Sequence, residues 1–222
     1  MEIEAKERIV NREGFDALRQ ALGTPESAVR QQNVFLDDET GTLRAARVGL
    51  RLRFYEEPAT KADTCLVTCK RGHTLSGGVA QAREDEDTVP ASAAREALAA
   101  ADVGGLAAHS AVLAAALREC RGPVRAYGAF VTHREAYPMS SVAALAHATP
   151  AEAAAVAPLR AEVDCTTYAF GATAFEVEIE GRSPAQVATA RALLVRALDA
   201  LHVLHHPTTR SKLACLVERV VD

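Results

Sequence analysis

Polar and apolar residues alternate along several stretches of the chain. Residues 2–10 alternate charged side chains with apolar or small ones, and residues 48–56 and 65–71 repeat the pattern. This two-residue period is typical of β-strands with one polar and one apolar face. Further strands are predicted at 29–37, 79–87, 124–136, 158–168 and 173–181. We therefore expect about eight strands.

Helical segments are predicted between and after these strands. Residues 13–22 have an amphipathic pattern, and Pro184 begins a long helix at its first turn. Residues 90–120 are rich in alanine, which has the best helix propensity, and should form two helices separated by Gly104-Gly105. Helical or irregular segments are also expected at 139–158 and 208–220. The pattern predicts one α+β domain over residues 1–222, with a helical insertion near 90–120.

The charges on the strand faces are sorted by sign. Side chains two residues apart in a strand point to the same face. Glu178 therefore shares a face with Glu176 and Glu180, whereas Arg51 shares a face with Arg53. Other strands place together Glu2, Glu4 and Lys6; Leu66, Thr68 and Lys70; Glu84 and Glu86; and Glu162 and Asp164.

A sheet with one solvated face would explain the alternation in any single strand. Like charges on one face repel each other, however, and nearly every strong strand pairs a charged face with an apolar one. Such a sheet can close into a barrel with its charges inside and helices covering its apolar exterior. Buried charges are costly unless they are paired or ligated. A divalent cation would neutralise the acids, and a polyanion would neutralise the bases.

The types of charged residue indicate which ligand the lumen would bind. Carboxylates are hard oxygen ligands of the kind that Mg²⁺ or Mn²⁺ prefers. Arginine offers a forked pair of donors to phosphate oxygens, and lysine offers a point charge. Sorted acids and bases in one lumen therefore predict a complex of metal and polyphosphate.

The composition excludes some classes of binding partner and indicates the cellular compartment. The net charge of −4 gives no global basic field, so neither nucleic acid nor a membrane surface is expected as a partner. The five cysteines lack zinc spacing and are odd in number, which favours reduced thiols in a cytoplasmic protein. The first residues have neither the basic nor the apolar region of a signal peptide, and we expect none. The sequence leaves the oligomeric state open.

The ordered series of motifs resembles the CYTH, or triphosphate tunnel metalloenzyme, superfamily. MEIEAK at 1–6 matches its ExExK signature, NVFLD at 33–37 its N-x-F-x-D strand and turn, and LRLR at 50–53 its paired arginine strand. The series continues with a leucine-arginine turn at 42–44, Thr68 to Lys70, Glu84 to Glu86, Arg134, the block from Glu162 to Glu180, and Ser211-Lys212. The details are most similar to plant and algal inorganic tripolyphosphatases. The chain departs from many members at Thr132, where they have a second basic residue.

The resemblance implies a closed eight-stranded antiparallel tunnel, with helices packed outside, that binds triphosphate and Mg²⁺ or Mn²⁺. It implies catalytic roles for Glu2 and Glu4, which would orient the attacking water. The implied metal ligands are Glu2, Glu4, Asp164, Glu176 and Glu178. The implied phosphate-binding residues are Lys6, Arg51, Arg53, Lys70, Arg134 and Lys212. Further candidates are Arg44, Glu84 and Glu86.

The implied reaction is metal-dependent hydrolysis of the terminal phosphoanhydride of inorganic tripolyphosphate, which gives pyrophosphate and phosphate. The superfamily also includes thiamine triphosphatases, RNA 5′-triphosphatases and adenylate cyclases. An organic group usually binds on an aromatic platform, and this chain has no Trp and only 5% aromatic residues, although Phe54 or Tyr55 could supply a ring. A non-catalytic polyphosphate-binding module would need only the bases. Both acidic ExE pairs are present, which favours an enzyme.

Three other groups are interpreted as structural. The histidines between 202 and 206 would interact with the C-terminal dipole of the long helix. Cys65 and Cys69 lie on the apolar face of their strand and would be small core residues. DDET at 37–40 should be a solvated turn and not a calcium loop, because the spacing of an EF-hand is absent.

Overall fold

The computed structural model describes residues 2–57 and 62–221, except for the side chains of Glu2 and Glu57. In this part of the chain nine strands form one sheet. Their bounds are β1 Glu2–Ile9, β2 Ser27–Asp38, β3 Gly49–Glu57, β4 Thr64–Ser76, β5 Val79–Pro90, β6 Val124–Pro138, β7 Arg160–Tyr168, β8 Thr173–Gly181 and β9 His205–Pro207. Every described strand pairing is antiparallel.

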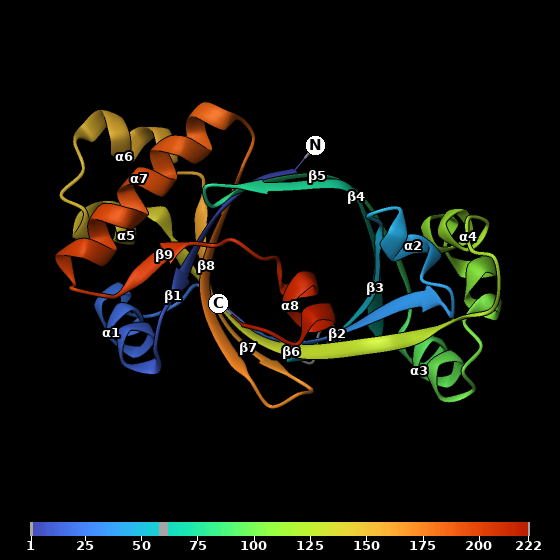
Figure 1. Ribbon diagram of the computed structural model, residues 1–222. Helices are drawn as coiled ribbons and strands as arrows, with labels where there is room; N and C mark the ends of the chain where they lie inside the picture. The colour runs from blue at the N-terminus through green and yellow to red at the C-terminus, as the bar shows by residue number, and fades with distance from the viewer. Residues whose placement is uncertain (1, 58–61, 222) are drawn as a thin grey trace.

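The sheet closes on itself. β1 pairs with β8 along one edge and with β5 along the other, so β1 to β8 form a closed eight-stranded barrel (Figure 1). Strand β9 pairs with residues 7–9 of β1, beyond residues 2–5, which pair with β5. Lys6 lies at this division, where its backbone N–H donates to the Gly78 carbonyl at 2.7 Å and its carbonyl accepts from the Thr208 N–H at 3.1 Å. The prediction of a closed antiparallel barrel is confirmed.

Helices cover the barrel on two opposite sides (Figure 1). One group consists of α1 Arg12–Leu22, α5 Met139–Leu145, α6 Pro150–Val156 and α7 Pro184–Ala200. The other consists of α3 Ala91–Ala99, the 3-10 helix η2 Gly104–His109 and α4 Ala111–Leu117. The outward faces of the strands pack against them: Val177 shares a core with Leu194 of α7, and Leu52 shares a second core with Leu113 of α4. Among the described helices, none is long and apolar enough to cross a membrane.

The alanine-rich segment near 90–120 forms three helices and not the predicted two. The first break comes before the glycine pair, at residues 100–103, where Ala101 has a φ of 53°, and the glycine pair itself begins η2. Val103 and Leu106 are buried in the core beneath this segment, which holds the connection against the barrel as a short turn of helix. Ser110 then starts α4, with its side chain accepting from the N–H of Leu113.

The prediction for the histidines between 202 and 206 is wrong in its location. Helix α7 ends at Ala200, and His202 has already left the helical path with a φ of 55°. His205 and His206 form part of β9, where the ring of His205 lies 3.2 Å from a carboxylate oxygen of Glu7. Pairing with β1 therefore sets their position, and the helix dipole does not.

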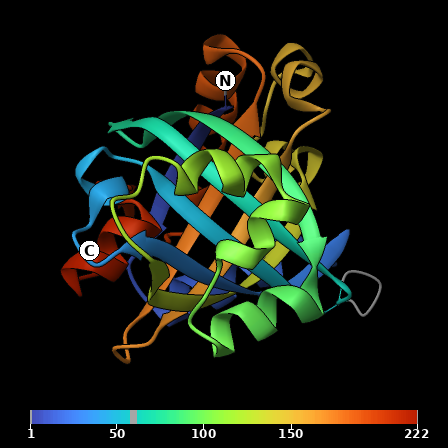
Figure 2. The ribbon, with the colours of Figure 1, turned by 90° about the vertical axis from the view of Figure 1, so that its right-hand side faces the viewer.

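The last helix lies at one end of the barrel. Helix α8 Lys212–Glu218 is capped by Ser211 and is at the same end as the short helix α2 Thr42–Ala45 (Figures 1 and 2). Its Leu216 packs with Phe35 and Phe130. We call this end the α8 mouth. The opposite end, toward which β3 runs from Gly49 to Tyr55, is the Tyr55 mouth.

Replacing Gly78 by alanine should destabilise the fold more than the same change at Gly77. Both glycines have positive φ, of 77° and 56°, so an alanine is strained at either position. Only at Gly78 would a Cβ lie 2.8 Å from the backbone oxygen of Lys6, whereas nothing lies within 4 Å at Gly77. Overpacking of this kind costs roughly 1–3 kcal/mol. Urea unfolding of the two variants measures the difference, and equal stability would contradict the close contact.

Candidate functional site

The barrel encloses a cavity of about 1020 Å³. Inward-facing residues from all eight barrel strands line it, together with the turn after α2 and several residues of α8. Among the residues singled out from the sequence, those that line it are Glu4, Lys6, Arg44, Arg51, Arg53, Lys70, Glu84, Glu86, Arg134, Asp164, Glu178 and Lys212. The side chain of Glu2 lies outside the described part of the chain. The alternation of the strands thus brings most of the predicted site residues into one space.

Glu178 is the centre of the acidic part of the cavity. Its Oε1 accepts from Lys6 Nζ at 2.5 Å and from Lys212 Nζ at 2.7 Å, and its Oε2 accepts from Arg134. Lys6 also lies 3.0 Å from Glu4. The register explains the convergence, because β8 places Glu178 opposite Lys6 of β1.

Arg134 binds a second group of acids on β7. Its Nε donates to Asp164 Oδ1 at 2.7 Å and its Nη2 to Asp164 Oδ2 at 2.6 Å, which is the forked geometry of a strong arginine–carboxylate pair. It also contacts Glu162. Lys212 Nζ lies 2.8 Å from Asp164, so one lysine of α8 reaches acids on two strands. Asp164 is 0% exposed.

Burial and ion pairing act on Glu178 in opposite directions. Burial alone would raise the pKa of its carboxyl, but Lys212, Lys6 and Arg134 outweigh it and hold the pKa well below the usual range. Burial would likewise lower the pKa of Lys6, but Glu178 and Glu4 raise it above the usual lysine value. The carboxylate and the lysines are therefore all charged at neutral pH.

The opposite wall of the cavity, on β3 and β4, is basic. Arg53 Nε donates to Asn33 Oδ1 at 3.0 Å, and Arg51 Nη2 donates to Thr68 Oγ1 at 3.1 Å. Lys70 Nζ lies 3.1 Å from Glu84, and Arg51 is 3.6 Å from the same carboxylate. Glu84 is therefore shared by Lys70 and Arg51.

Arg51 differs from the other described bases that line the cavity. Its Nε is buried and has no hydrogen-bond partner. Burial and the neighbouring Arg53 lower its pKa to about 9, and Glu84 and Glu86 only partly offset this. Because a guanidinium stays protonated in proteins, the lowered pKa indicates a cation that lacks sufficient negative charge nearby. This part of the cavity is built to receive an anion.

Glu176 is on the predicted strand face but does not line the open cavity. It is 1% exposed, and its carboxylate accepts from Thr208 Oγ1 and from Lys212 Nζ, each at 2.7 Å. Arg8 lies 3.7 Å away on the neighbouring strand. Glu176 thus connects the barrel wall to the beginning of α8.

Arg44 lines the cavity near the α8 mouth, but other contacts hold it. Its Nε lies 3.2 Å from Asp37, and its guanidinium lies 4.3 Å from the centre of the Tyr127 ring. The contact with Asp37 is to a fully buried carboxylate, so it also helps to fix the α2 turn.

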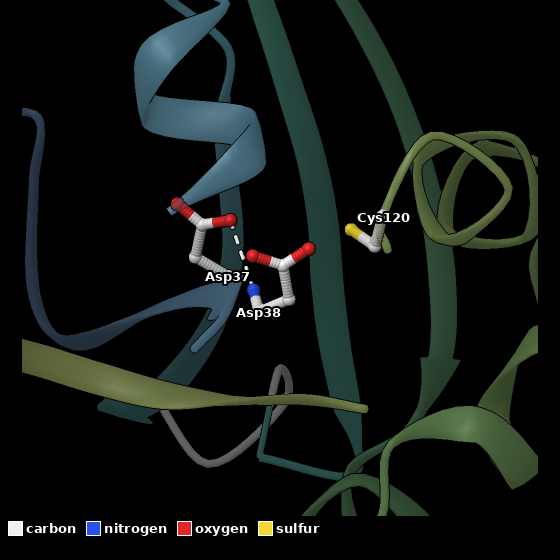
Figure 3. Close-up of side chains that lie close together, drawn as sticks. All are labelled: Asp37, Asp38 and Cys120. Atoms are coloured by element: carbon white, nitrogen blue, oxygen red, sulfur yellow. Dashed lines mark hydrogen bonds between the residues drawn. The ribbon is translucent and has the colours of Figure 1, made fainter. Parts of the chain in front are cut away.

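The prediction of a solvated turn at 37–40 is confirmed for Glu39 and Thr40, which form an exposed turn, and is wrong for Asp37 and Asp38. Asp37 and Asp38 are 2% and 4% exposed, and they lie close to Cys120 (Figure 3). Asp37 accepts from the backbone N–H groups of Asp38, Leu43 and Arg44. The backbone N–H groups at the start of a short helix need acceptors, and these carboxylates provide them. We interpret the cluster as a helix cap and assign no metal to it.

Several cavity residues were not singled out as site residues from the sequence. Glu162 had a usable signal, because it lies two residues before Asp164 on the same strand face. Arg47 lies outside any strand, so the alternation could not place it. Thr132, where many members have a base, lines the cavity and hydrogen-bonds to Thr166 at 3.0 Å.

Comparisons with known proteins agree with this geometry. The model of the CYTH domain matches residues 1–207. A structure described as a proposed adenylyl cyclase from Hippeastrum with a dominant triphosphatase activity is 26% identical, with a TM-score of 0.82, and the alignment covers 100% of this chain and 97% of that one. A proposed adenylate cyclase from Bacillus halodurans is 21% identical, with a TM-score of 0.63 and coverage of 100% and 98%.

A Pyrococcus horikoshii protein shares the fold at 15% identity and a TM-score of 0.57, with coverage of 98% and 99%. No curated protein matches the chain. The family model spans β1 to β9 and stops before α8. The closed barrel, its charged lumen and the matching family model lead to one conclusion: the chain belongs to the CYTH domain family.

Proposed function

We propose that the protein is a divalent-metal-dependent hydrolase of inorganic tripolyphosphate, which cleaves the terminal phosphoanhydride to give pyrophosphate and phosphate. The main support is the under-neutralised Arg51 in a cavity whose opposite wall carries a cluster of carboxylates. A polyphosphate would supply the missing negative charge, and a cation would join it to the acids. The triphosphatase activity described for the similar Hippeastrum protein agrees with this chemistry.

The donor set fits a hard divalent cation. Glu4, Asp164 and Glu178 present carboxylate oxygens in or beside one cavity, and only such oxygen ligands suit Mg²⁺ or Mn²⁺ well. In this proposal Glu2 and Glu176 are further ligands. The bound ion would neutralise charge that develops on the phosphate oxygens.

The bases of the chain would hold the substrate. Arg51, Arg53 and Lys70 grip the phosphate oxygens from the basic wall, which keeps the phosphate chain extended for in-line attack. Lys6, Arg134 and Lys212 pair with the acids in this structure. A cation bound by those acids would neutralise part of their charge, and the three bases would then also bind phosphate.

Glu4 is the proposed orienter or general base for the attacking water, together with Glu2. Glu4 lines the cavity and is 7% exposed, so a water beside it is largely shielded from bulk solvent. A carboxylate in this position would accept a proton from the water as the bond to phosphorus forms. Glu178, which is tied to three cations, serves better as a fixed ligand than as a base.

The cavity contains little aromatic surface for an organic group. Phe54 is 1% exposed and belongs to the outer core, where Arg95 lies 4.5 Å from the centre of its ring. Phe35 and Phe130 line the cavity but pack with α8. Tyr55 and the imidazole of His73 are the remaining rings among the described lining residues. The scarcity of rings favours a substrate that consists of phosphates alone.

A second candidate function is hydrolysis of an organic triphosphate such as thiamine triphosphate. A small side cavity of about 160 Å³ adjoins the lumen at the Tyr55 mouth and is lined by Ser27, Val29 and Gln31 beside Tyr55. A ring and polar side chains could hold an organic group there. A third possibility is a polyphosphate-binding module without catalysis, which would use the bases alone. A cytoplasmic location also stays part of the proposal, supported by five free cysteines.

A phosphate-release panel tests the substrate. With Mg²⁺ or Mn²⁺, tripolyphosphate should be hydrolysed with a kcat/KM about tenfold or more above that of ATP and thiamine triphosphate. The reason is that the cavity offers little aromatic surface on which the organic groups of these two substrates could bind. Pyrophosphate should accumulate, and EDTA should stop turnover. Faster hydrolysis of thiamine triphosphate would select the second candidate. Tight tripolyphosphate binding without turnover would select the binding module.

Replacing Glu4 by glutamine should reduce kcat by about 100-fold or more, because the water loses its acceptor while the shape of the side chain is kept. Circular dichroism should show a folded protein. The matched control is Glu13→Gln on the exposed surface of α1, which should leave kcat unchanged. Wild-type turnover by the Glu4 variant would remove Glu4 from the proposed mechanism.

A further inference from the structure

The two mouths of the cavity carry different charges. Near the α8 mouth the lining includes Arg44, Arg47, Lys70 and His73. The lining near the Tyr55 mouth includes Arg53, Arg134 and Glu162, and Arg134 is already bound by three carboxylates. A polyanion is attracted most strongly by exposed bases that no carboxylate neutralises, because a cleft with low-dielectric walls concentrates the field of its charges. The charge difference therefore favours entry of an anion at the α8 mouth.

Arg47 has an unusual backbone conformation at this rim. It connects α2 to β3 with a φ of 56°, and its N–H donates to the carbonyl of Arg44 at 3.0 Å. A residue other than glycine in this left-handed region costs roughly 1–2 kcal/mol. Glycine would adopt the same turn without that cost. The same left-handed conformation follows other helices, at Ala101, His147, His202 and Arg219. It marks the end of α2, where glycine can replace Arg47 without disturbing the turn.

The side chain of Arg47 is available to a ligand in a way that Arg44 is not. Arg44 is held by Asp37 and by the ring of Tyr127. Arg47 is exposed and lines the cavity, and within residues 2–57 and 62–221 it makes no ion pair. It also precedes Gly49 by two residues, and Gly49 pairs with Lys70 of β4. Basic residues thus continue inward from Arg47 to Lys70, and then to Arg51 and Arg53.

We propose that Arg47 is a substrate-capture residue, which contacts the incoming polyphosphate at the α8 mouth and delivers it to Lys70 and Arg51. This inference rests on the proposed function only in taking a polyphosphate as the ligand. Arg47 acts on association and not on bond cleavage. Its contribution to binding is electrostatic. Because the side chain is exposed to solvent, this contribution weakens as the salt concentration rises.

The sharpest test replaces Arg47 by glycine, because glycine removes the side chain and relieves the backbone strain together. Isothermal titration with tripolyphosphate in EDTA should show about three- to fivefold weaker binding, the size expected for one partly exposed charged contact. The melting temperature should stay equal or rise. In turnover assays kcat should be unchanged, and kcat/KM should fall at low salt and approach the wild-type value at about 0.5 M salt.

Arg219→Gly is the matched control. Arg219 is also an exposed arginine in the left-handed conformation, with a φ of 57°, and it ends α8 without lining the cavity. Its replacement changes the net charge and the backbone in the same way, but should leave tripolyphosphate binding unchanged. A second variant, Arg47→Lys, keeps the charge and should retain most of the affinity.

Three results would overturn the proposal. These are wild-type affinity in Arg47→Gly, an equal loss of affinity in Arg47→Gly and Arg219→Gly, or a lower melting temperature that accompanies weaker binding in Arg47→Gly. Wild-type affinity would show that Arg47 does not contact the ligand. An equal loss in both variants would show that only the net charge matters. A lower melting temperature would show that the side chain of Arg47 supports the fold. Because the titration needs neither metal nor turnover, a protein that binds tripolyphosphate without hydrolysing it would refute the hydrolase and still decide the role of Arg47.

Discussion

The mutual neutralisation of charges inside a closed barrel is the constraint on which this structure depends. Glu178 is buried with Lys6, Arg134 and Lys212 around it, and each group would be costly in isolation. Closure of the sheet places the acids of β1, β7 and β8 opposite the bases of β3 and β4. The helices then cover the apolar exterior of the barrel. Ion pairs thus neutralise the acids of this lumen, whereas the wall that carries Arg51 still lacks negative charge.

The bases of the site form two groups. Lys6, Arg134 and Lys212 already have carboxylate partners, whereas Arg51 has a buried nitrogen without any. The first group balances the acids, and the second is the region in which an anion gains most. Ligand binding would therefore rearrange existing ion pairs as well as form new ones. This exchange of partners limits the net free energy of binding, because the loss of an existing ion pair offsets part of the gain from a new contact.

The strand pattern predicted about eight strands with one charged face, because alternation fixes which face each side chain occupies. The closed tunnel and the roles of its residues were expectations from the resemblance to the CYTH superfamily. The strand pattern could not show which side chains on the inner face are covered by other segments of the chain. Glu176 and Glu178 share a face, but Thr208 covers only the first, whereas Lys212 binds both. It could not place Arg47, which lies in a turn. The buried Asp37 was also missed, since its acceptors serve the backbone of α2, a tertiary detail that composition does not reveal.

The divided edge of β1 has a consequence for how the molecule assembles. This first strand pairs with β8 and β9, which lie more than 160 residues later in the chain, and with β5. During synthesis many of its hydrogen-bonding groups stay without their final partners until β8 and β9 have left the ribosome. Contacts so distant in sequence are slow to form, and an unpaired strand edge attracts other chains in the meantime. The charges on one face of β1 lower that risk during the wait, because a charged strand is a poor template for aggregation.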